Sequence, residues 1–127
     1  MSGLTYDAGA LIAAERGDRR MWQIHTRALA RGRAPAVPAP VVIEVYRSAK
    51  QVQLSRFLPG CVIDVLDESR AKIAGGLLER CHLDVGAVDA SCVELTLRRG
   101  DSVVTSNHEH LLALAAGVDR KLNVIHV

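Results

Sequence analysis

The sequence predicts an α/β fold with a central, mostly parallel sheet flanked by helices on both faces. Short apolar or β-branched runs alternate with longer helical segments along the 127 residues, which is the order typical of parallel sheets. Apolar residues make up 49% of the chain and charged residues 24%, as in an ordinary folded domain. A chain of this length buries one core, so we expect a single domain over residues 1–127.

The first part of the chain is predicted to begin with a strand that ends at Asp7. Asp18 is a suitable N-cap for the second helix, and Pro40 suits the start of the third, where its missing N–H costs nothing. The predicted elements, in order, are strand 4–7, helix 8–15, helix 18–31, strand 36–37, helix 40–46 and a helical continuation over 51–58. The buried side of the second helix is expected to consist of Trp22, Ile24, Ala28 and Leu29.

The second part continues the alternation of strands and helices. Asp67 or Ser69 is expected to cap a helix, and Gly100 to close the next one in a left-handed conformation. The predicted elements are strand 61–66, helix 67–81, helix 85–99, strand 102–105, helix 109–116 and strand 122–127.

Charge and cysteine content restrict the class of protein. The net charge of +2 does not by itself indicate a polyanionic partner. The three cysteines are widely spaced and form no C-x-x-C pair, which favours reduced thiols over a zinc site or a disulfide framework. The sequence also has no secretory pattern and no apolar run of membrane-spanning length. We therefore expect a cytoplasmic protein.

Three acidic residues have apolar sequence neighbours and therefore differ from the others. Asp7 follows the first strand, whereas Glu44 and Asp89 lie on predicted helices, and the triplet 105–107 (Thr-Ser-Asn) ends a strand. Ligands of open parallel sheets bind outside the carboxyl ends of the strands, so these groups can converge. Carboxylates that share a pocket repel one another, and a hard divalent cation relieves that repulsion. The sequence predicts a site for Mg2+ or Mn2+.

Each of these acids also has a structural explanation. Asp7 can cap a helix that starts at Ala8, and Asp89 can cap one that starts at Ala90. Glu44 can pair with Arg47, because a buried glutamate without a partner is costly. Asp64 lies within the strand predicted over 61–66, where alternation can point it outward, and is interpreted as structural. Other acids lie beside basic or turn residues and are expected on solvated surfaces, among them Glu15, Glu94 and Asp101.

Taken in order, these motifs resemble the PIN-domain ribonuclease family, in particular the VapC toxins of bacterial toxin–antitoxin pairs. The matching motifs are Asp7-Ala8-Gly9, Glu44 within Val42-Ile43-Glu44-Val45, Asp89-Ala90, and Thr105-Ser106-Asn107. The resemblance covers nearly the whole chain. It implies a PIN-like fold, Mg2+- or Mn2+-dependent endonucleolytic cleavage of RNA, a cognate antitoxin and a homodimer.

The resemblance also implies roles for single residues. Asp7 and Asp89 would be metal ligands, and Glu44 would complete the metal shell or activate the attacking water. Thr105 and Asn107 would position the site through hydrogen bonds.

The chain departs from the family pattern at two places. A small hydroxyl residue commonly follows the first Asp, and here that residue is Ala8. The family's fourth acid sits at one of two places that Asn107 and His110 occupy here, with Glu109 between them. Whether Asn107, Glu109 or His110 replaces the fourth acid is open at this point.

A basic cluster early in the chain has two interpretations, a solvated helix face or a phosphate-binding patch near the site. Its members are Arg16, Arg19, Arg20, Arg27, Arg31 and Arg33. The five histidines show no ligand spacing, and His108 and His110 are expected to face solvent in a loop.

Two other functions fit parts of the pattern. A phosphoacceptor signalling domain would use Asp64 and Thr105, but it usually needs an acid pair after the first strand, where only Asp7 stands. A catalytically weak or inactive PIN-like RNA-binding module is favoured by Asn107, which brings no charge.

Overall fold

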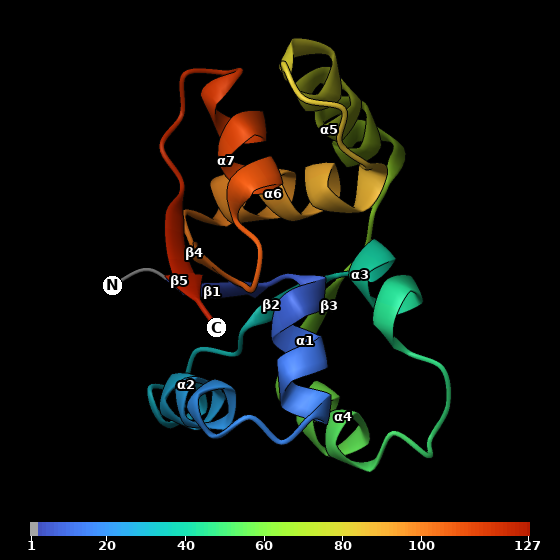
Figure 1. The fold of residues 1–127 in the computed structure, drawn as a ribbon, viewed down its shortest axis with the longest axis vertical. Coiled ribbons are helices and arrows are strands. Elements are labelled where there is room, and N and C mark those ends of the chain that lie inside the picture. Colours follow the sequence, from blue (N-terminus) through green and yellow to red (C-terminus); the bar gives the residue numbers. More distant parts are fainter. Residues whose placement is uncertain (1–2) are drawn as a thin grey trace.

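The computed structural model describes residues 3–127, which form a five-stranded sheet between two layers of helices (Figure 1). All strand pairs are parallel, in the order β3-β2-β1-β4-β5. The strands are β1 (Leu4–Tyr6), β2 (Ala36–Pro38), β3 (Val62–Asp64), β4 (Ser102–Thr105) and β5 (Asn123–His126). The helices are α1 (Ala8–Glu15), α2 (Arg19–Ala30), α3 (Ala39–Val45), α4 (Val52–Phe57), the 3-10 turn η1 (Leu58–Gly60), α5 (Glu68–Arg80), α6 (Ala87–Arg99) and α7 (Glu109–Ala116).

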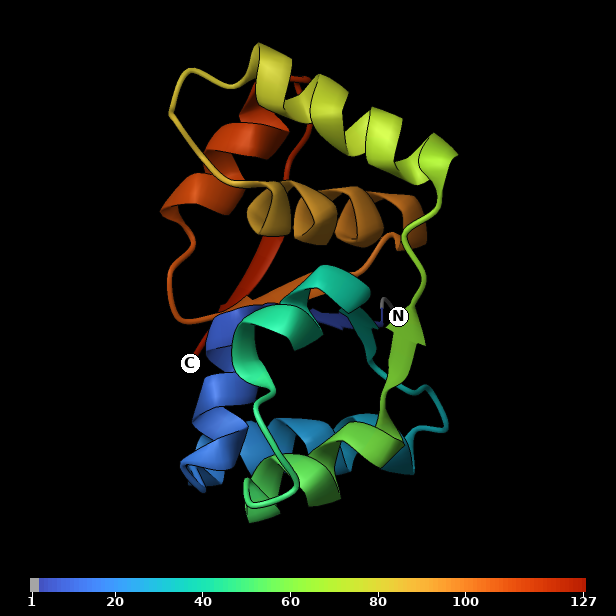
Figure 2. The same cartoon turned by 90° about the vertical axis from the view of Figure 1, so that its right-hand side faces the viewer.

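Helices cover both faces of the sheet, as the sequence predicts. Figures 1 and 2 show α1, α2 and α4 on one face and α5, α6 and α7 on the other. One apolar core lies under the first group and includes Tyr6, Leu11 and Phe57. A second core lies under the other group and includes Val93 and Leu111. Among the residues that the structure describes, no helix has the length and hydrophobicity required to cross a membrane.

The strand order places a topological switch point between β1 and β4. The chain builds β1, β2 and β3 in one direction and then returns to add β4 and β5 on the other side of β1. In open α/β sheets, ligands bind at such a point, outside the carboxyl ends of the strands. Residues that directly follow β1 and β4 are therefore placed to form a site.

Three expected helix boundaries differ from the structure. The third helix ends at Val45 instead of continuing to residue 58, and α4 is a separate short helix. Residues 46–51 break the helix, and the Gln51 side chain holds this segment by accepting from Arg47 N and donating to Val45 O. The α6 helix begins at Ala87 with Gly86 as its N-cap, so Asp89 lies in the first turn and caps no helix.

The buried side of α2 also differs from the prediction. Met21, His25 and Ala28 are buried, whereas Leu29 is exposed and Trp22 and Ile24 are half-buried. His25 is tolerated in the core because its Nδ1 lies 3.0 Å from the Tyr6 hydroxyl and its ring stacks on Phe57 at 3.8 Å. Burial lowers the pKa of His25 and favours the neutral ring.

Candidate functional site

The Asp7 carboxylate lies at the switch point and is almost fully buried, with 7% of the residue exposed. Asp7 follows β1 and is the N-cap of α1, where its Oδ1 accepts from Ala8 N at 2.7 Å. Its Oδ2 accepts from the Thr105 hydroxyl at 2.9 Å. No described ion pair includes Asp7. The structure therefore holds a buried carboxylate with two hydrogen bonds and no described cationic partner.

Thr105 joins the ends of the two central strands. It is the last residue of β4, and the register of β1 and β4 places it one residue beyond the Tyr6–Val104 pair, beside Asp7. Its Oγ1 also accepts from Asn107 N at 3.1 Å. Asn107 thus supports Thr105 through its backbone, while its exposed side chain lies 3.4 Å from Glu109 N at the start of α7.

Gly9 allows the loop after β4 to lie against α1. A Cβ at position 9 would lie 2.8 Å from Ser106 N and 2.9 Å from Ser106 Cβ, closer than real Cβ atoms approach. Any side chain there would displace the turn that carries Thr105 and Asn107. Gly9 belongs to the first motif, but the sequence does not indicate its role, because its contact Ser106 lies almost a hundred residues away.

Asp89 projects from the first turn of α6 and pairs with His110 of α7. Asp89 Oδ2 lies 3.2 Å from His110 Nδ1, and both side chains are partly exposed, at 29% and 43% respectively. The expectation that His110 faces solvent in a loop is therefore wrong. Three residues are candidates for the fourth-acid position. The side chain of His110 contacts the predicted ligand Asp89, whereas Asn107 and Glu109 are exposed.

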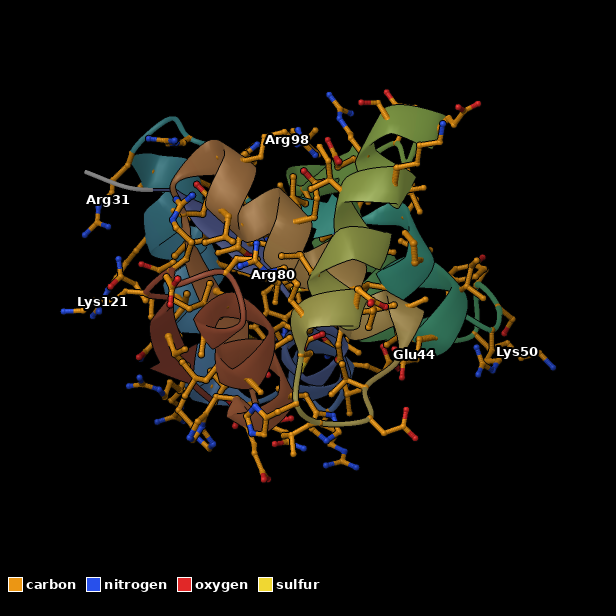
Figure 3. The ribbon with its side chains drawn as sticks, turned by 90° about the horizontal axis from the view of Figure 1, so that it is seen from above. Arg31, Glu44, Lys50, Arg80, Arg98 and Lys121 are labelled. Carbon is orange, nitrogen blue, oxygen red and sulfur yellow. The ribbon has the colours of Figure 1, made fainter. Side chains whose placement is uncertain are left out.

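Glu44 lies on α3 at the molecular surface. Figure 3 shows it at the periphery, and the residue is exposed rather than buried as expected. The alternative pairing with Arg47 is also absent, since that guanidinium donates to Ile43 O and Tyr46 O, each at 2.9 Å. α3 is only seven residues long and buries Val41 and Val45, which leaves Glu44 on its outer side.

The three acids act on one another electrostatically. Burial raises the pKa of the Asp7 carboxyl; the hydrogen bonds from Ala8 and Thr105 oppose this rise, and the charges of Asp89 and Glu44 add to it. The charges of Asp7 and Asp89 also act on the buried thiol of Cys92. Burial raises its pKa, and Asp7 and Asp89 raise it further. Asp89 and Glu44 are thus near enough to Asp7 for the charge of each to destabilise the ionised form of Asp7.

The donor set fits a hard divalent cation held mainly through water. Within residues 3–127, no three His, Cys, Asp or Glu side chains form a ready metal cage. Mg2+ keeps several waters and is commonly bound through one or two carboxylates, and Asp7 and Asp89 are the carboxylates that would hold it here. Burial, and to a smaller extent the charges of Asp89 and Glu44, raise the pKa of Asp7, and a bound cation would stabilise its ionised form.

The arginine cluster is divided between different parts of the surface, so the phosphate-binding patch, one of its two interpretations, is not formed as one unit. Arg27, Arg31 and Arg33 line a cavity together with Gly3 at the amino end of β1. Arg20 lies near the carboxyl end of β5, where its Nε donates to His126 O at 3.3 Å. Figure 3 shows Arg31 on the opposite side of the molecule from Glu44.

Three acids expected on solvated surfaces have structural roles instead. Asp101 and Glu94 are buried, and they pair with Arg99 and Arg98 at 2.7 and 2.9 Å. Glu15 accepts from Leu54 N and ties α1 to α4. Each was missed because the environment that buries it comes from distant parts of the chain.

The geometry contradicts a phosphoacceptor domain. Asp64 lies on the edge strand β3 and pairs with Arg98 at 2.7 Å, far from the switch point between β1 and β4. The strand order also differs from the 2-1-3-4-5 order of such doubly wound sheets.

Comparison with solved structures decides the fold. A DNA-bound VapBC from Salmonella typhimurium superposes with a TM-score of 0.74 at 15% identity, covering 99% of this chain and 98% of that one. VapBC2 from Rickettsia felis, bound to a promoter DNA fragment, gives 0.72 at 15% identity, with 98% of both chains covered. The chain has a PIN-like fold. A toxin–antitoxin complex from Klebsiella pneumoniae gives 0.69 at 22% identity, covering 98% of this chain and 96% of that one.

The PIN-like fold confirms the architecture that the sequence motifs implied. No protein-family model and no curated protein matches the chain, so the likeness is one of structure. At identities of 15–22%, it is the backbone arrangement that is shared. The chemistry of this particular chain therefore has to be argued from its own residues.

Proposed function

We propose that this chain is a VapC-like toxin, a Mg2+- or Mn2+-dependent endoribonuclease held inactive by a cognate antitoxin. The buried Asp7 carboxylate, at the switch point and without a described cationic partner, supports this most strongly. The structural neighbours that are toxin–antitoxin complexes support the toxin class and an antitoxin partner. A homodimer and a cytoplasmic location belong to the same proposal.

Hydrolysis of a phosphodiester needs an activated water, an in-line approach and compensation of charge on the phosphate. A bound divalent cation supplies the last of these and lowers the pKa of a coordinated water. Asp7 and Asp89 would hold the cation, and Thr105 keeps the Asp7 carboxylate in place through its hydroxyl. His110 fixes Asp89 from the other side.

Glu44 is the group proposed to take the proton. The water oxygen forms a bond to phosphorus, the bond from phosphorus to the leaving ribose oxygen breaks, and that oxygen takes a proton from solvent water. Glu44 is exposed and can receive the proton of the attacking water and exchange it with solvent. Asn107 supports the reaction only through the Thr105 turn.

Cleavage of RNA by the purified chain tests the proposal. Antitoxin-free protein should cut a subset of structured RNAs with Mg2+ or Mn2+, and a chelator should stop the cleavage. Asp7→Asn should reduce the rate at least about a hundredfold, or roughly 3 kcal/mol in barrier. Asp119→Asn is the matched control, because this exposed residue has a φ of 55°, which Asn tolerates.

The inactive RNA-binding module is the second candidate, since Asn107 is neutral and no three-ligand cage is present in residues 3–127. Metal-independent RNA binding without cleavage, at equal affinity in wild type and Asp7→Asn, would favour that module and contradict the nuclease.

A further inference from the structure

A cavity of about 480 Å3 lies between α2 and the sheet, and Asp7, Asp89 and Glu44 are not among its lining residues. Its apolar surface comes from Leu4 of β1, Ile125 of β5, and Ile24 and Ala28 of α2. A cavity of this size with a mostly apolar surface is typical of small-molecule sites. α2 leaves this part of the sheet only partly covered, because Leu4, Ile24 and Ile125 are half-buried rather than buried.

Within residues 3–127, three arginines and no acidic residue complete the lining of this cavity. Arg27 and Arg31 are four residues apart at the end of α2, and Arg33 follows in the next turn. The side chains of Arg27 and Arg31 are exposed and make no hydrogen bond or ion pair with any residue in the described range 3–127. Like charges at this spacing repel and destabilise a helix, so an anion bound between them is favoured.

The third guanidinium is held at the cavity by the fold. Arg33 lies 3.7 Å from the buried carboxylate of Asp101, which also pairs with Arg99 and accepts from the Thr5 hydroxyl. A Cβ at Gly3 would lie 2.6 Å from Arg33 Nε and 2.8 Å from Asp101 Oδ1. Gly3 therefore lets Arg33 approach the start of β1. A guanidinium fixed in this way loses little freedom when it binds a phosphate or carboxylate.

We propose that this cavity binds a small organic anion, with a phosphate or carboxylate head on the arginines and an aliphatic body on Leu4, Ile24 and Ile125. The arginine fork matches both head groups, and the aliphatic lining matches an alkyl body. Among the described residues, no aromatic side chain lines the cavity, so these residues do not offer the stacking that single-stranded RNA uses. The site is independent of the proposed nuclease activity.

Titration of the full chain with octyl phosphate, followed by methyl NMR, tests this site. We expect saturable shifts at Leu4, Ile24 and Ile125, whereas Ile63 on the edge strand β3 stays unchanged. Arg27→Gln/Arg31→Gln should weaken binding at least tenfold. Because both residues are exposed, the double variant should keep the wild-type melting temperature. Arg80→Gln, on exposed α5 surface, is the matched control and should bind as wild type does.

Several results would overturn the proposal. If octanol binds as tightly as octyl phosphate, the arginines do not recognise the negative charge of the phosphate. Inorganic phosphate binding equally well would show that the apolar lining is not used. Shifts confined to other residues, or an RNA oligonucleotide that displaces octyl phosphate at lower concentration, would assign the arginines to a different ligand. Equal binding by the double variant would remove the arginines from the site.

Discussion

Asp7 caps the helix α1, and its surroundings disfavour the negative charge of its carboxylate. Its two oxygens stabilise the start of α1 and the end of β4, yet burial and two neighbouring acids disfavour its charge. A purely structural residue at this position could be Asn, which caps helices about as well and carries no charge. The cap alone therefore does not require the charge of Asp7, whereas a bound cation would stabilise it.

The first prediction concerns the pH dependence of stability in metal-free protein. The folded-state pKa of Asp7 is raised above that of the unfolded chain, so its contribution is most favourable at low pH, where both states are protonated. That contribution is lost as the pH rises through the raised pKa. Asp7→Asn should therefore gain stability relative to wild type from acidic to neutral pH, measured by urea denaturation in EDTA. A constant difference between the two proteins over that range would contradict the raised pKa.

A second prediction concerns His110, which stands at one of the two places where the PIN-domain pattern that the sequence resembles has an acid. His110→Asp would put a carboxylate beside Asp89, and repulsion should lower the melting temperature in EDTA. Added Mn2+ should then raise the melting temperature more than it does for wild type, because the site gains a charged oxygen ligand. His108→Asp is the control, since His108 is exposed and faces His126 rather than Asp89. Equal Mn2+ shifts in all three proteins would place His110 outside the cation's surroundings.

At the scale of elements, local signals in the sequence predicted most of the fold. Asp67 caps α5 through Arg70 N, and Gly100 ends α6 with a φ of 69°, both as expected from residue type. Signals that depend on distant residues were missed. Thr5 and Asp101 are 96 residues apart, and no local pattern indicates that their hydrogen bond buries the carboxylate.

The candidate site shows the same limit. Asp7 beside Thr105 follows from parallel strands, since residues that end neighbouring strands meet at one edge. The exposure of Glu44 depends on which side of a seven-residue helix packs inward. Because its sequence neighbours on both sides are apolar, the sequence does not indicate that side. The contact of His110 with Asp89 depends on how α6 and α7 pack.

Gly9 provides the third prediction. Gly9→Ala should destabilise the protein by about 1–3 kcal/mol, because the new methyl group overlaps Ser106 and forces the turn away from α1. Gly75→Ala on α5 is the matched control, since nothing lies within 4 Å of its Cβ and Ala is the better helix former by about 0.5–1 kcal/mol. Urea midpoints of the two variants should move in opposite directions, and a Gly9→Ala midpoint at or above wild type would refute the close packing.

On the scale of the whole molecule, the sheet topology accounts for the convergence of residues that are far apart in sequence. The switch between β1 and β4 brings together the ends of two strands, while α6 and α7 add Asp89 and His110 from one face. The other side of the sheet, where α2 leaves Leu4 and Ile125 half-covered, carries the arginine-lined cavity. The proposed cation site and the proposed anion site thus lie at different edges of one small fold.

We propose that Asp7 belongs to a cation site, and a Mn2+ binding isotherm is the most direct test of this role. Electron paramagnetic resonance of free Mn2+ can be recorded during titration of wild type, Asp7→Asn and the control Asp119→Asn. We predict saturable binding by wild type and the control, and at least tenfold weaker binding by Asp7→Asn, which is about 1.4 kcal/mol. Identical isotherms for wild type and Asp7→Asn would contradict the account.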